Sequence, residues 1–361
     1  MRLTDEIKRS RRPFVIAGPC SAETEEQVVQ TAQTITADDR VRILRAGIWK
    51  PRTRPNSFEG LGEKALHWLV KAGEITGRRT TTEVANSKHV EMALNAGVDI
   101  LWVGARTTVN PFAVQEIADA LKGSKVPVMI KNPVNPDLSL WMGAFERFER
   151  VGLDDLTAIH RGFSVYSHPK YRNIPRWEIP IALKEERPST PIIVDPSHIT
   201  GNRDLLAEVS QKALDLDFEG LMIETHPDPE NALSDQAQQL TPKALLDLID
   251  KLILRSKDYS KDVADEIAEI RQKVETLDDR MFEILSERMK MSEWVGELKR
   301  TNNITILQQA HWTRVINSRL EGAQDFGLTK KFVRQLMDAI HQESIRHQTS
   351  IMNPYKKGED E

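Results

Sequence analysis

Eight short runs of strand-forming residues alternate with amphipathic stretches between residue 13 and about residue 254, and no other feature limits the fold as strongly. The runs extend from FVIAG at 14–18 to GLMIE at 220–224, and stretches such as SKHVEMALNAG between them have helical spacing. Strands that alternate with helices predict a parallel sheet. Eight such units in about 240 residues match a closed (β/α)₈ barrel, that is, a TIM barrel. An open, doubly wound sheet is the alternative, although it rarely needs eight repeats.

The composition places the chain among globular proteins of about two domains, because 361 residues exceed one typical domain. No run approaches ~18 consecutive apolar residues, so we expect no membrane-spanning helix. The first 14 residues, MRLTDEIKRSRRPF, lack the apolar stretch of a signal peptide. A single cysteine cannot form an internal disulfide, which favours the cytoplasm. The net charge of −4 argues against a nucleic-acid partner.

Polar side chains follow nearly every predicted strand. In a (β/α)₈ barrel the carboxyl ends of the strands surround the active site, so we expect these side chains to share one mouth. They are Cys20, Arg45, Lys50, Glu83, Arg106, Lys131, His160, Arg161, Asp195, His198, Glu224 and His226.

Two chemical groups make up this ring. Five cations at one mouth require an anionic substrate, and guanidinium groups favour phosphate and carboxylate. A second group, Cys20, His198, Glu224 and Asp235, offers sulfur, nitrogen and oxygen donors that suit a divalent transition metal. Taken singly, each donor also has a structural explanation: Cys20 as a small buried apolar residue, His198 as a helix cap, Glu224 as a surface carboxylate.

Seven motifs in order resemble 3-deoxy-D-arabino-heptulosonate 7-phosphate (DAHP) synthase of the compact bacterial class over about residues 13–254. They are AGPCSAE, LRAGIWKPRTRP, VGAR, MIKNP, HRGF, VDPSH and MIETHPDPENALSDQAQQL. The resemblance implies condensation of phosphoenolpyruvate with erythrose 4-phosphate, the first step of the shikimate pathway. It also implies one divalent metal ion (Mn²⁺, Fe²⁺, Co²⁺ or Zn²⁺), which polarises the sugar aldehyde.

The resemblance also assigns roles. It implies that the metal ligands are Cys20, His198, Glu224 and Asp235. The phosphoenolpyruvate ligands would be Arg106, Lys131, Arg161, Arg45 and Lys50, while Arg52 and Thr53 would bind erythrose 4-phosphate. Lys131 is a candidate proton donor, and Glu83 and Asp195 are further candidate substrate-binding residues of the ring.

Two alternatives remain for the barrel. The related 3-deoxy-octulosonate 8-phosphate synthases carry a KANRS stretch where this chain has KPRTRP, which favours the four-carbon sugar here. A Schiff-base aldolase that uses Lys131 or Lys50 is more distant, and a chelator would not inhibit it.

The chain beyond residue 254 has no strand pattern. A polar linker, 255–262, precedes a heptad seam of apolar residues that runs from Ile267 to Leu298 and is interrupted by Arg288. A helix over 263–300 would be about 55 Å long, so a partner chain is expected to cover it. Arg288 is either a register-setting residue or a ligand-binding cation, and Lys299, on nearly the same face, favours a ligand. Helices are also expected at about 308–322 and 329–350, with a disordered tail at 353–361.

Residues 263–352 are therefore predicted to form a second, all-helical domain after the 1–254 barrel, and this segment resembles the all-helical chorismate mutases. The resemblance implies rearrangement of chorismate to prephenate, with Arg271 and Arg288 on the carboxylates and Lys299 and Gln348 beside the ether oxygen. It implies that Ser344 also binds substrate, and that Arg271 reaches across from the other subunit of an interlocked homodimer or higher homo-oligomer.

One stretch departs from the mutase pattern. Where that family usually has an acidic residue and an arginine, this chain reads QQAHW, with Gln308, His311 and Trp312. Gln308 is the candidate substitute for contacting the substrate hydroxyl.

The helical domain is also expected to transmit feedback inhibition of the barrel by prephenate or chorismate, since only about a dozen residues precede the first strand. The alternative is a module that only dimerises or regulates the protein.

Overall fold

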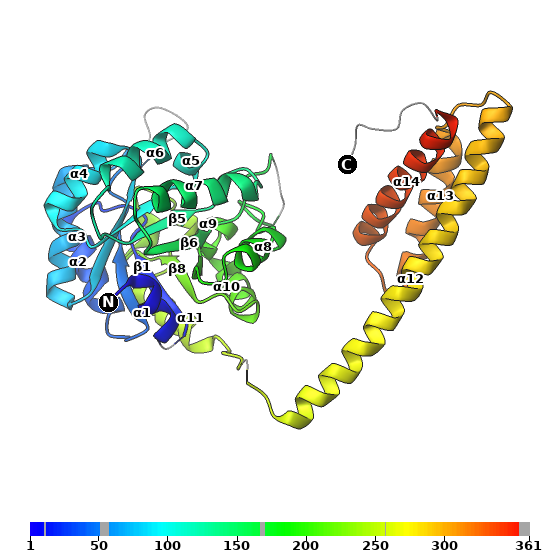
Figure 1. Ribbon diagram of the computed structural model, residues 1–361. Coiled ribbons are helices and arrows are strands. Elements are labelled where there is room, and N and C mark those ends of the chain that lie inside the picture. The colour runs from blue at the N-terminus through cyan, green and yellow to red at the C-terminus, as the bar shows by residue number, and fades with distance from the viewer. Residues whose placement is uncertain (11, 51–57, 167–169, 257, 354–361) are drawn as a thin grey trace. The chain divides into compact units, whose positions relative to one another are not determined.

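The computed structural model describes residues 1–361 apart from 11, 51–57, 167–169, 257 and 354–361. The chain forms two compact units, Met1–Ser256 and Lys257–Glu361 (Figure 1). The first helix of the second unit begins at Lys261, two residues earlier than the sequence suggested, because the Ser260 side chain accepts a hydrogen bond from the N–H of Val263. All of the expected tail except Asn353 lies outside the described residues.

Eight parallel strands close into a barrel in the order β1 to β8, which confirms the predicted fold and excludes the open sheet. Each strand pairs with its neighbours in sequence, and β8 pairs with β1. The strands are β1 (Phe14–Gly18), β2 (Val41–Arg45), β3 (Arg79–Val84), β4 (Ile100–Val103), β5 (Val128–Lys131), β6 (Leu156–His160), β7 (Ile192–Val194) and β8 (Gly220–Glu224).

Helices surround the barrel in the alternating pattern that the sequence predicts (Figure 1). They are α1 (Leu3–Arg9), α2 (Glu25–Ile35), α3 (Glu63–Thr76), α4 (Ser87–Ala96), α5 (Ala105–Thr108), α6 (Pro111–Ala120), α7 (Leu138–Arg150), α8 (Glu178–Glu186), α9 (Pro196–Thr200), α10 (Leu206–Asp215) and α11 (Pro242–Lys251). Short 3₁₀ turns lie at Arg203–Leu205, Pro229–Asn231 and Gln236–Gln238.

The apolar core has two layers. One lies between strands and helices and includes Val15 and Phe145, and the other fills the barrel interior around residues such as Ile16. Alternate residues of a strand point to opposite faces, which is why adjacent residues of β1 belong to different layers. Leu3 and Ile7 of α1 join the interior layer, so this helix closes the amino-terminal end of the barrel and leaves the carboxyl end for the site.

The end of β1 is shaped by a close approach to β2. Gly18 pairs with Glu224 of β8 and has a φ of +146°. A Cβ atom at this position would lie 2.0 Å from the carbonyl oxygen of Arg45, so only glycine fits. This approach brings Cys20, two residues later, to the carboxyl-terminal mouth beside the end of β8.

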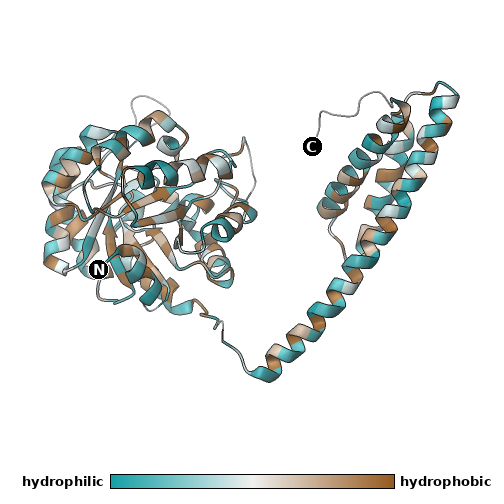
Figure 2. Ribbon diagram, viewed as in Figure 1, coloured by the Kyte–Doolittle hydropathy of each residue, from teal (hydrophilic) through white to brown (hydrophobic). Residues whose placement is uncertain are grey.

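The second unit consists of α12 (Lys261–Thr301), α13 (Gln309–Glu321), a 3₁₀ turn (Gly322–Phe326) and α14 (Lys330–Met352). The helix α14 packs along the carboxyl-terminal part of α12 (Figure 1). Hydrophobic residues recur along the rest of α12 as well (Figure 2), where the exposed apolar side chains include Ile270, Val274, Leu277, Met281 and Ile284. Within the described ranges, no helix combines the length and the apolar character that crossing a membrane requires.

Candidate active sites

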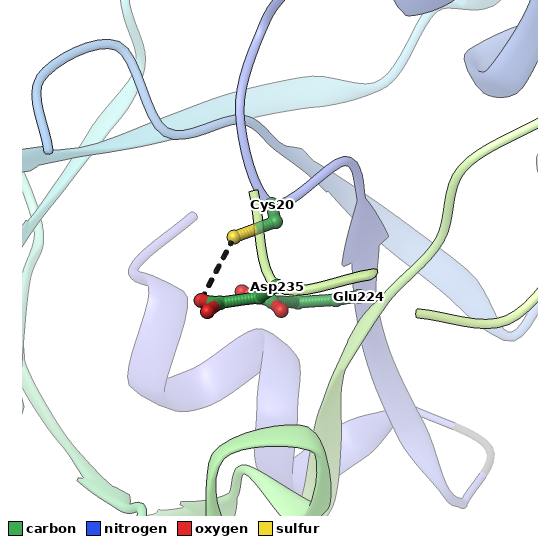
Figure 3. A group of neighbouring side chains, drawn as sticks. All are labelled: Cys20, Glu224 and Asp235. Carbon is green, nitrogen blue, oxygen red and sulfur yellow. Dashed lines mark hydrogen bonds between the residues drawn. The ribbon is translucent and has the colours of Figure 1, made fainter. Parts of the chain in front are cut away.

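Three metal-binding side chains converge at the mouth of the barrel. Cys20 follows β1, Glu224 ends β8, and Asp235 lies in the loop after β8. One donor atom from each lies within 4.8 Å of the other two (Figure 3). The Cys20 thiol donates a hydrogen bond to Oδ2 of Asp235 at 3.3 Å. Asp235 has a φ of +47°, a backbone conformation that is uncommon outside glycine, at the residue whose carboxylate completes the cluster.

Burial and the surrounding charges shift the pKa values of this cluster. Burial, followed by the negative charge of Glu224, raises the pKa of the Cys20 thiol to about 12. The pKa of Glu224 stays below its usual value despite burial, because the charges of His198 and Arg45 favour the carboxylate. Lys50 also faces the thiol, with Nζ 2.9 Å from Sγ. The pocket thus stabilises anionic ligands but holds the thiol protonated unless more positive charge is present.

The donor set fits a divalent transition metal. A thiol together with carboxylates at this spacing is unsuited to Mg²⁺ or Ca²⁺, which prefer all-oxygen ligands. Oε1 of Glu224 lies 3.1 Å from Nη1 of Arg45, yet it accepts no well-aligned hydrogen bond from the described part of the chain. A fully buried carboxylate oxygen in this condition is available as a ligand atom.

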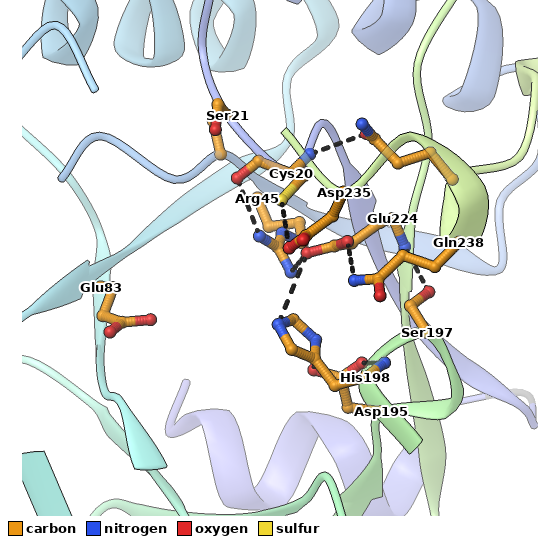
Figure 4. A network of polar contacts seen from close by, with 12 residues as sticks. Cys20, Ser21, Arg45, Glu83, Asp195, Ser197, His198, Glu224, Asp235 and Gln238 are labelled. Carbon is orange, nitrogen blue, oxygen red and sulfur yellow. Dashed lines mark hydrogen bonds and ion pairs between the residues drawn. The ribbon is translucent and has the colours of Figure 1, made fainter. Parts of the chain in front are cut away.

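His198 lies at the edge of this cluster rather than within it (Figure 4). Its Nε2 atom is 3.8 Å from Oε1 of Glu224, and its Nδ1 atom is 2.8 Å from Oδ2 of Asp195. Asp195 is the N-cap residue of α9 and accepts a hydrogen bond from the backbone N–H of His198. Asp195 therefore orients the imidazole ring, as carboxylates commonly do for metal-binding histidines.

Two of the buried cations lie near an indole ring that was not among the residues predicted from sequence. Trp102 of β4 is 1% exposed, with the guanidinium carbon of Arg45 at 5.0 Å and Nζ of Lys131 at 5.6 Å from its ring centroid. Its Nε1–H donates to Oε2 of Glu83 at 2.9 Å. Lys131 also pairs with Asp195, at 2.9 Å. In sequence Trp102 reads as an ordinary strand residue, so no signal marked it.

The remaining members of the predicted ring differ in their surroundings. Arg161 is buried and donates to Oδ1 of Asn173 at 2.8 Å, and burial lowers its pKa to about 10, with Arg172 and Arg106 adding to the effect. Arg106 is exposed on α5. Arg52 and Thr53 lie outside the described residues.

Two histidines of the ring do not join the metal-donor cluster. His160 packs against Trp177 and Phe163, with ring centroids at 5.3 and 5.8 Å. Nε2 of His226 lies 3.4 Å from Oε2 of Glu23. The expectation that residues at the ends of the strands share one mouth therefore locates the site. It does not distinguish side chains that face the barrel interior from those that face the surrounding helices.

A second polar cluster lies between α12 and α14. Nζ of Lys299 donates to the carbonyl oxygen of Ile306 at 2.6 Å and to Oε1 of Gln348 at 3.0 Å, and Nη1 of Arg288 donates to Oγ of Ser344 at 2.5 Å. Burial lowers the pKa of both cations. Within the described residues neither cation has a carboxylate partner, which is costly unless an anionic ligand binds.

Two predicted members of this second site stand apart from the cluster. Arg271 is exposed near the start of α12, and Gln308 is exposed at the N-cap of α13 without a capping hydrogen bond from its side chain. Trp312, in the departing stretch, stacks on His341 of α14 with ring centroids 3.9 Å apart and planes 7° apart.

A (β/α)₈ barrel with metal donors and buried cations at its carboxyl end defines a class of enzymes that act on anionic substrates. The chain belongs to the DAHP synthetase I family, whose sequence profile matches residues 6–259. The profile of chorismate mutase type II matches residues 270–349. The chain is thus an enzyme with a DAHP synthase domain and a chorismate mutase domain, as the motifs predicted.

Individual relatives carry the names of both enzymes considered for the barrel. A phospho-2-dehydro-3-deoxyheptonate aldolase of Thermotoga maritima is 32% identical over 238 residues, which cover 66% of this chain and 68% of the relative. The crystal structure of a Thermotoga maritima enzyme of that name, also called DAHP synthase, superposes with a TM-score of 0.60 at 31% identity, covering 66% of this chain and 67% of that one. A 2-dehydro-3-deoxyphosphooctonate aldolase of Wolinella succinogenes is 28% identical over 68% of this chain and 99% of its own length.

Proposed function

We propose that the mouth of the barrel condenses phosphoenolpyruvate with erythrose 4-phosphate, using the residues described above. One observation carries the proposal: a buried thiol–carboxylate cluster directly adjoins buried cations at the end of the barrel where such enzymes bind substrate. In this proposal, the carboxylate and phosphate of phosphoenolpyruvate occupy the cationic half, with Lys131, Arg161 and Arg106 as their main partners.

Lys131 has two contacts that suit a proton donor. Its ammonium group lies 2.9 Å from Oδ2 of Asp195 and 5.6 Å from the ring centroid of Trp102, so a carboxylate and an aromatic ring fix its position. From this position Lys131 is proposed to deliver a proton to the reacting phosphoenolpyruvate. Arg45, paired with Glu224, connects the cationic half to the metal-donor half.

For the metal, we propose Cys20, Glu224 and Asp235 as ligands, with His198 as the fourth, and Mn²⁺, Fe²⁺, Co²⁺ or Zn²⁺ as the ion. When bound, the ion would supply a Lewis acid for the aldehyde of the sugar phosphate. Asp195 keeps the imidazole ring of His198 oriented toward the cluster.

The test for the barrel compares two sugar phosphates. Purified protein is incubated with phosphoenolpyruvate, one divalent metal and either erythrose 4-phosphate or arabinose 5-phosphate, and phosphate release and the keto-acid product are measured. The proposal expects the seven-carbon product, since KPRTRP at 50–55 favours the shorter sugar. Preference for the five-carbon sugar would support the 3-deoxy-octulosonate 8-phosphate alternative instead.

For the helical unit we propose rearrangement of chorismate to prephenate between α12 and α14. The reaction is unimolecular, so the site has only to hold the reactive conformer and stabilise charge on the ether oxygen. Lys299 and Gln348 are proposed to flank that oxygen and Arg288 to bind a carboxylate. Arg288 and Lys299 have no carboxylate partner in the part of the chain that the structure describes, which supports this reaction over a module that only dimerises. Loss of the ultraviolet absorbance of chorismate, with prephenate identified as product, tests the proposal.

The exposed seam of α12 supports a homodimer. Ile270, Val274, Leu277 and Ile284 are each about half exposed or more, which is unusual for a row of apolar residues on one helix face. A second copy of the chain is proposed to cover this seam and to supply Arg271 to the mutase site of its partner.

Feedback inhibition of the barrel by prephenate or chorismate bound to the helical unit is proposed as well, in a protein that works in the cytoplasm. A chain that ends near Ser256 should then make the seven-carbon product without inhibition by prephenate, and a fragment that prephenate still inhibits would refute the idea.

A further inference from the structure

The stretch that departs from the mutase pattern contains one side chain with a defined partner. Trp312 of α13 stacks face to face on His341 of α14, 3.9 Å between ring centroids and 7° between planes. Gln308, the residue expected to replace the missing polar contact, is exposed and has no side-chain hydrogen bond among the described residues. His341 is therefore the better placed polar group.

His341 shares a helix face with the mutase residues of α14. It precedes Ser344 by three residues and Gln348 by seven, so all three side chains project from one side of the helix. Ser344 and Gln348 use that side to contact Arg288 and Lys299 of α12. The stack on Trp312 fixes the plane of the imidazole ring at this same cluster.

The imidazole ring of His341 is suited, in its neutral form, to donate one hydrogen bond and to accept another. Burial and then the charges of Arg288 and Lys299 on α12 lower the pKa of His341, opposed only in part by Asp338 on its own helix, and α13 contributes the uncharged Trp312. A neutral imidazole has one donor and one acceptor nitrogen. No hydrogen bond of either ring nitrogen occurs within the described ranges, so both are available to a ligand.

We infer that His341, held by Trp312, binds the ring hydroxyl of chorismate and is a further catalytic residue of the mutase. The inference rests on the proposed mutase function. Chorismate presents two carboxylates, an ether oxygen and one hydroxyl. In the proposed site Arg271 and Arg288 bind the carboxylates and Lys299 contacts the ether oxygen, which leaves the hydroxyl. An alcohol both donates and accepts, as a neutral imidazole does, whereas a cation would favour a carboxylate.

The test compares the full-length wild-type protein with His341→Phe, which keeps an aromatic ring for the stack and removes both nitrogens. The two substrates are chorismate and an analogue with hydrogen in place of the ring hydroxyl. With chorismate, kcat/KM should fall by about tenfold to a hundredfold in His341→Phe, the usual loss for a buried hydrogen bond. With the deoxy analogue the two proteins should turn over equally.

Two further variants distinguish a chemical role from a structural one. His341→Gln restores an amide donor and acceptor and should regain part of the lost turnover. His311→Phe changes an exposed histidine one residue before Trp312 and should leave kcat/KM unchanged. Equal turnover of chorismate by His341→Phe and wild type, or equal losses on both substrates, would overturn the role of His341 but leave the proposed mutase function intact. A wild-type protein that does not consume chorismate would overturn the proposed mutase function and this inference together.

Discussion

The ammonium group of Lys50 lies 2.9 Å from the sulfur of Cys20 and 2.8 Å from the carbonyl oxygen of the same residue. Burial and the charge of Glu224 raise the pKa of this thiol to about 12, and Lys50 partly opposes them. A thiolate in this pocket therefore requires additional positive charge, which a divalent ion would provide. The proposed role of the only cysteine of the chain as a metal ligand therefore has a measurable consequence.

Metal binding should consequently release a proton. When Co²⁺ or Zn²⁺ is titrated into chelator-treated protein near pH 7, we expect about one proton to leave Cys20 for each ion bound, because metal ligands must be deprotonated. Calorimetry in two buffers of different ionisation enthalpy measures the number. The Cys20→Ser variant should release no proton and bind at least about tenfold more weakly. Unchanged affinity and proton release in that variant would exclude Cys20 as a ligand.

Trp102 should affect substrate binding through the two cations that lie near its ring. Its ring lies beside Arg45 and Lys131, and its Nε1–H fixes Glu83. The Trp102→Phe variant keeps an aromatic face but loses the hydrogen bond, and we expect kcat/KM for phosphoenolpyruvate to fall about tenfold. Trp68→Phe is the matched control, since its neighbour Lys64 lies outside the ring of site residues. A Trp102 variant that matches this control would mean that the indole only fills space.

His160 should make the barrel less stable in acid. Burial lowers the pKa of His160 to about 3, below the value of about 6.5 in an unfolded chain. Between these values the unfolded state binds the extra proton, so the free energy of unfolding falls as pH falls, by up to about 1.4 kcal/mol per unit. Above about pH 6.5 this penalty is absent.

Urea unfolding of the barrel at pH 7, 6 and 5 tests this expectation. The loss of stability with falling pH should be smaller in His160→Met than in wild type, whereas substitution of the exposed His67 should leave it unchanged. Parallel pH profiles for wild type and His160→Met would show that His160 does not cause the effect.

The exposed seam of α12 should hold two copies of the chain together. Leu277 is 60% exposed, and a charge at this position would be buried in a helical dimer interface. Leu277→Glu should therefore shift the protein to monomers in light scattering and abolish chorismate turnover, since Arg271 of the partner is then missing. Glu275→Ala, two residues earlier on the helix, should change neither. A dimeric, active Leu277→Glu protein would contradict the proposed interface.

Local physical chemistry explains which features could be predicted from sequence. Most of the eight strands were predictable as short apolar runs bounded by polar residues, whereas β3, which reads RTTTEV, was predictable from its β-branched threonines. Cys20 and Glu224 could be placed together because parallel strands bring their carboxyl ends to one mouth, whereas Asp235, in the loop after β8, was included for its donor type and by the family resemblance. Arg288 was recognisable because a charge interrupts an apolar seam.

Other residues gave no signal because their surroundings come from distant parts of the chain. Trp102 has the composition of any buried strand residue, and only the closed barrel places Arg45 and Lys131 beside it. His341 is one histidine on a polar helix until α13 brings Trp312 against it. The closure of the barrel by Leu3 and Ile7 likewise depends on folding, since α1 is too short to show a pattern.

One chain is proposed to carry two separate catalytic sites, and a crossed assay of two variants distinguishes them. Lys131→Met should lose at least about a hundredfold in formation of the seven-carbon sugar acid while it consumes chorismate normally. Arg288→Ala should show the reverse, with chorismate turnover lost and sugar-acid formation retained. Wild-type protein that leaves chorismate unchanged, or a single variant that abolishes both activities in a folded protein, would show that the chain does not carry two separate catalytic sites.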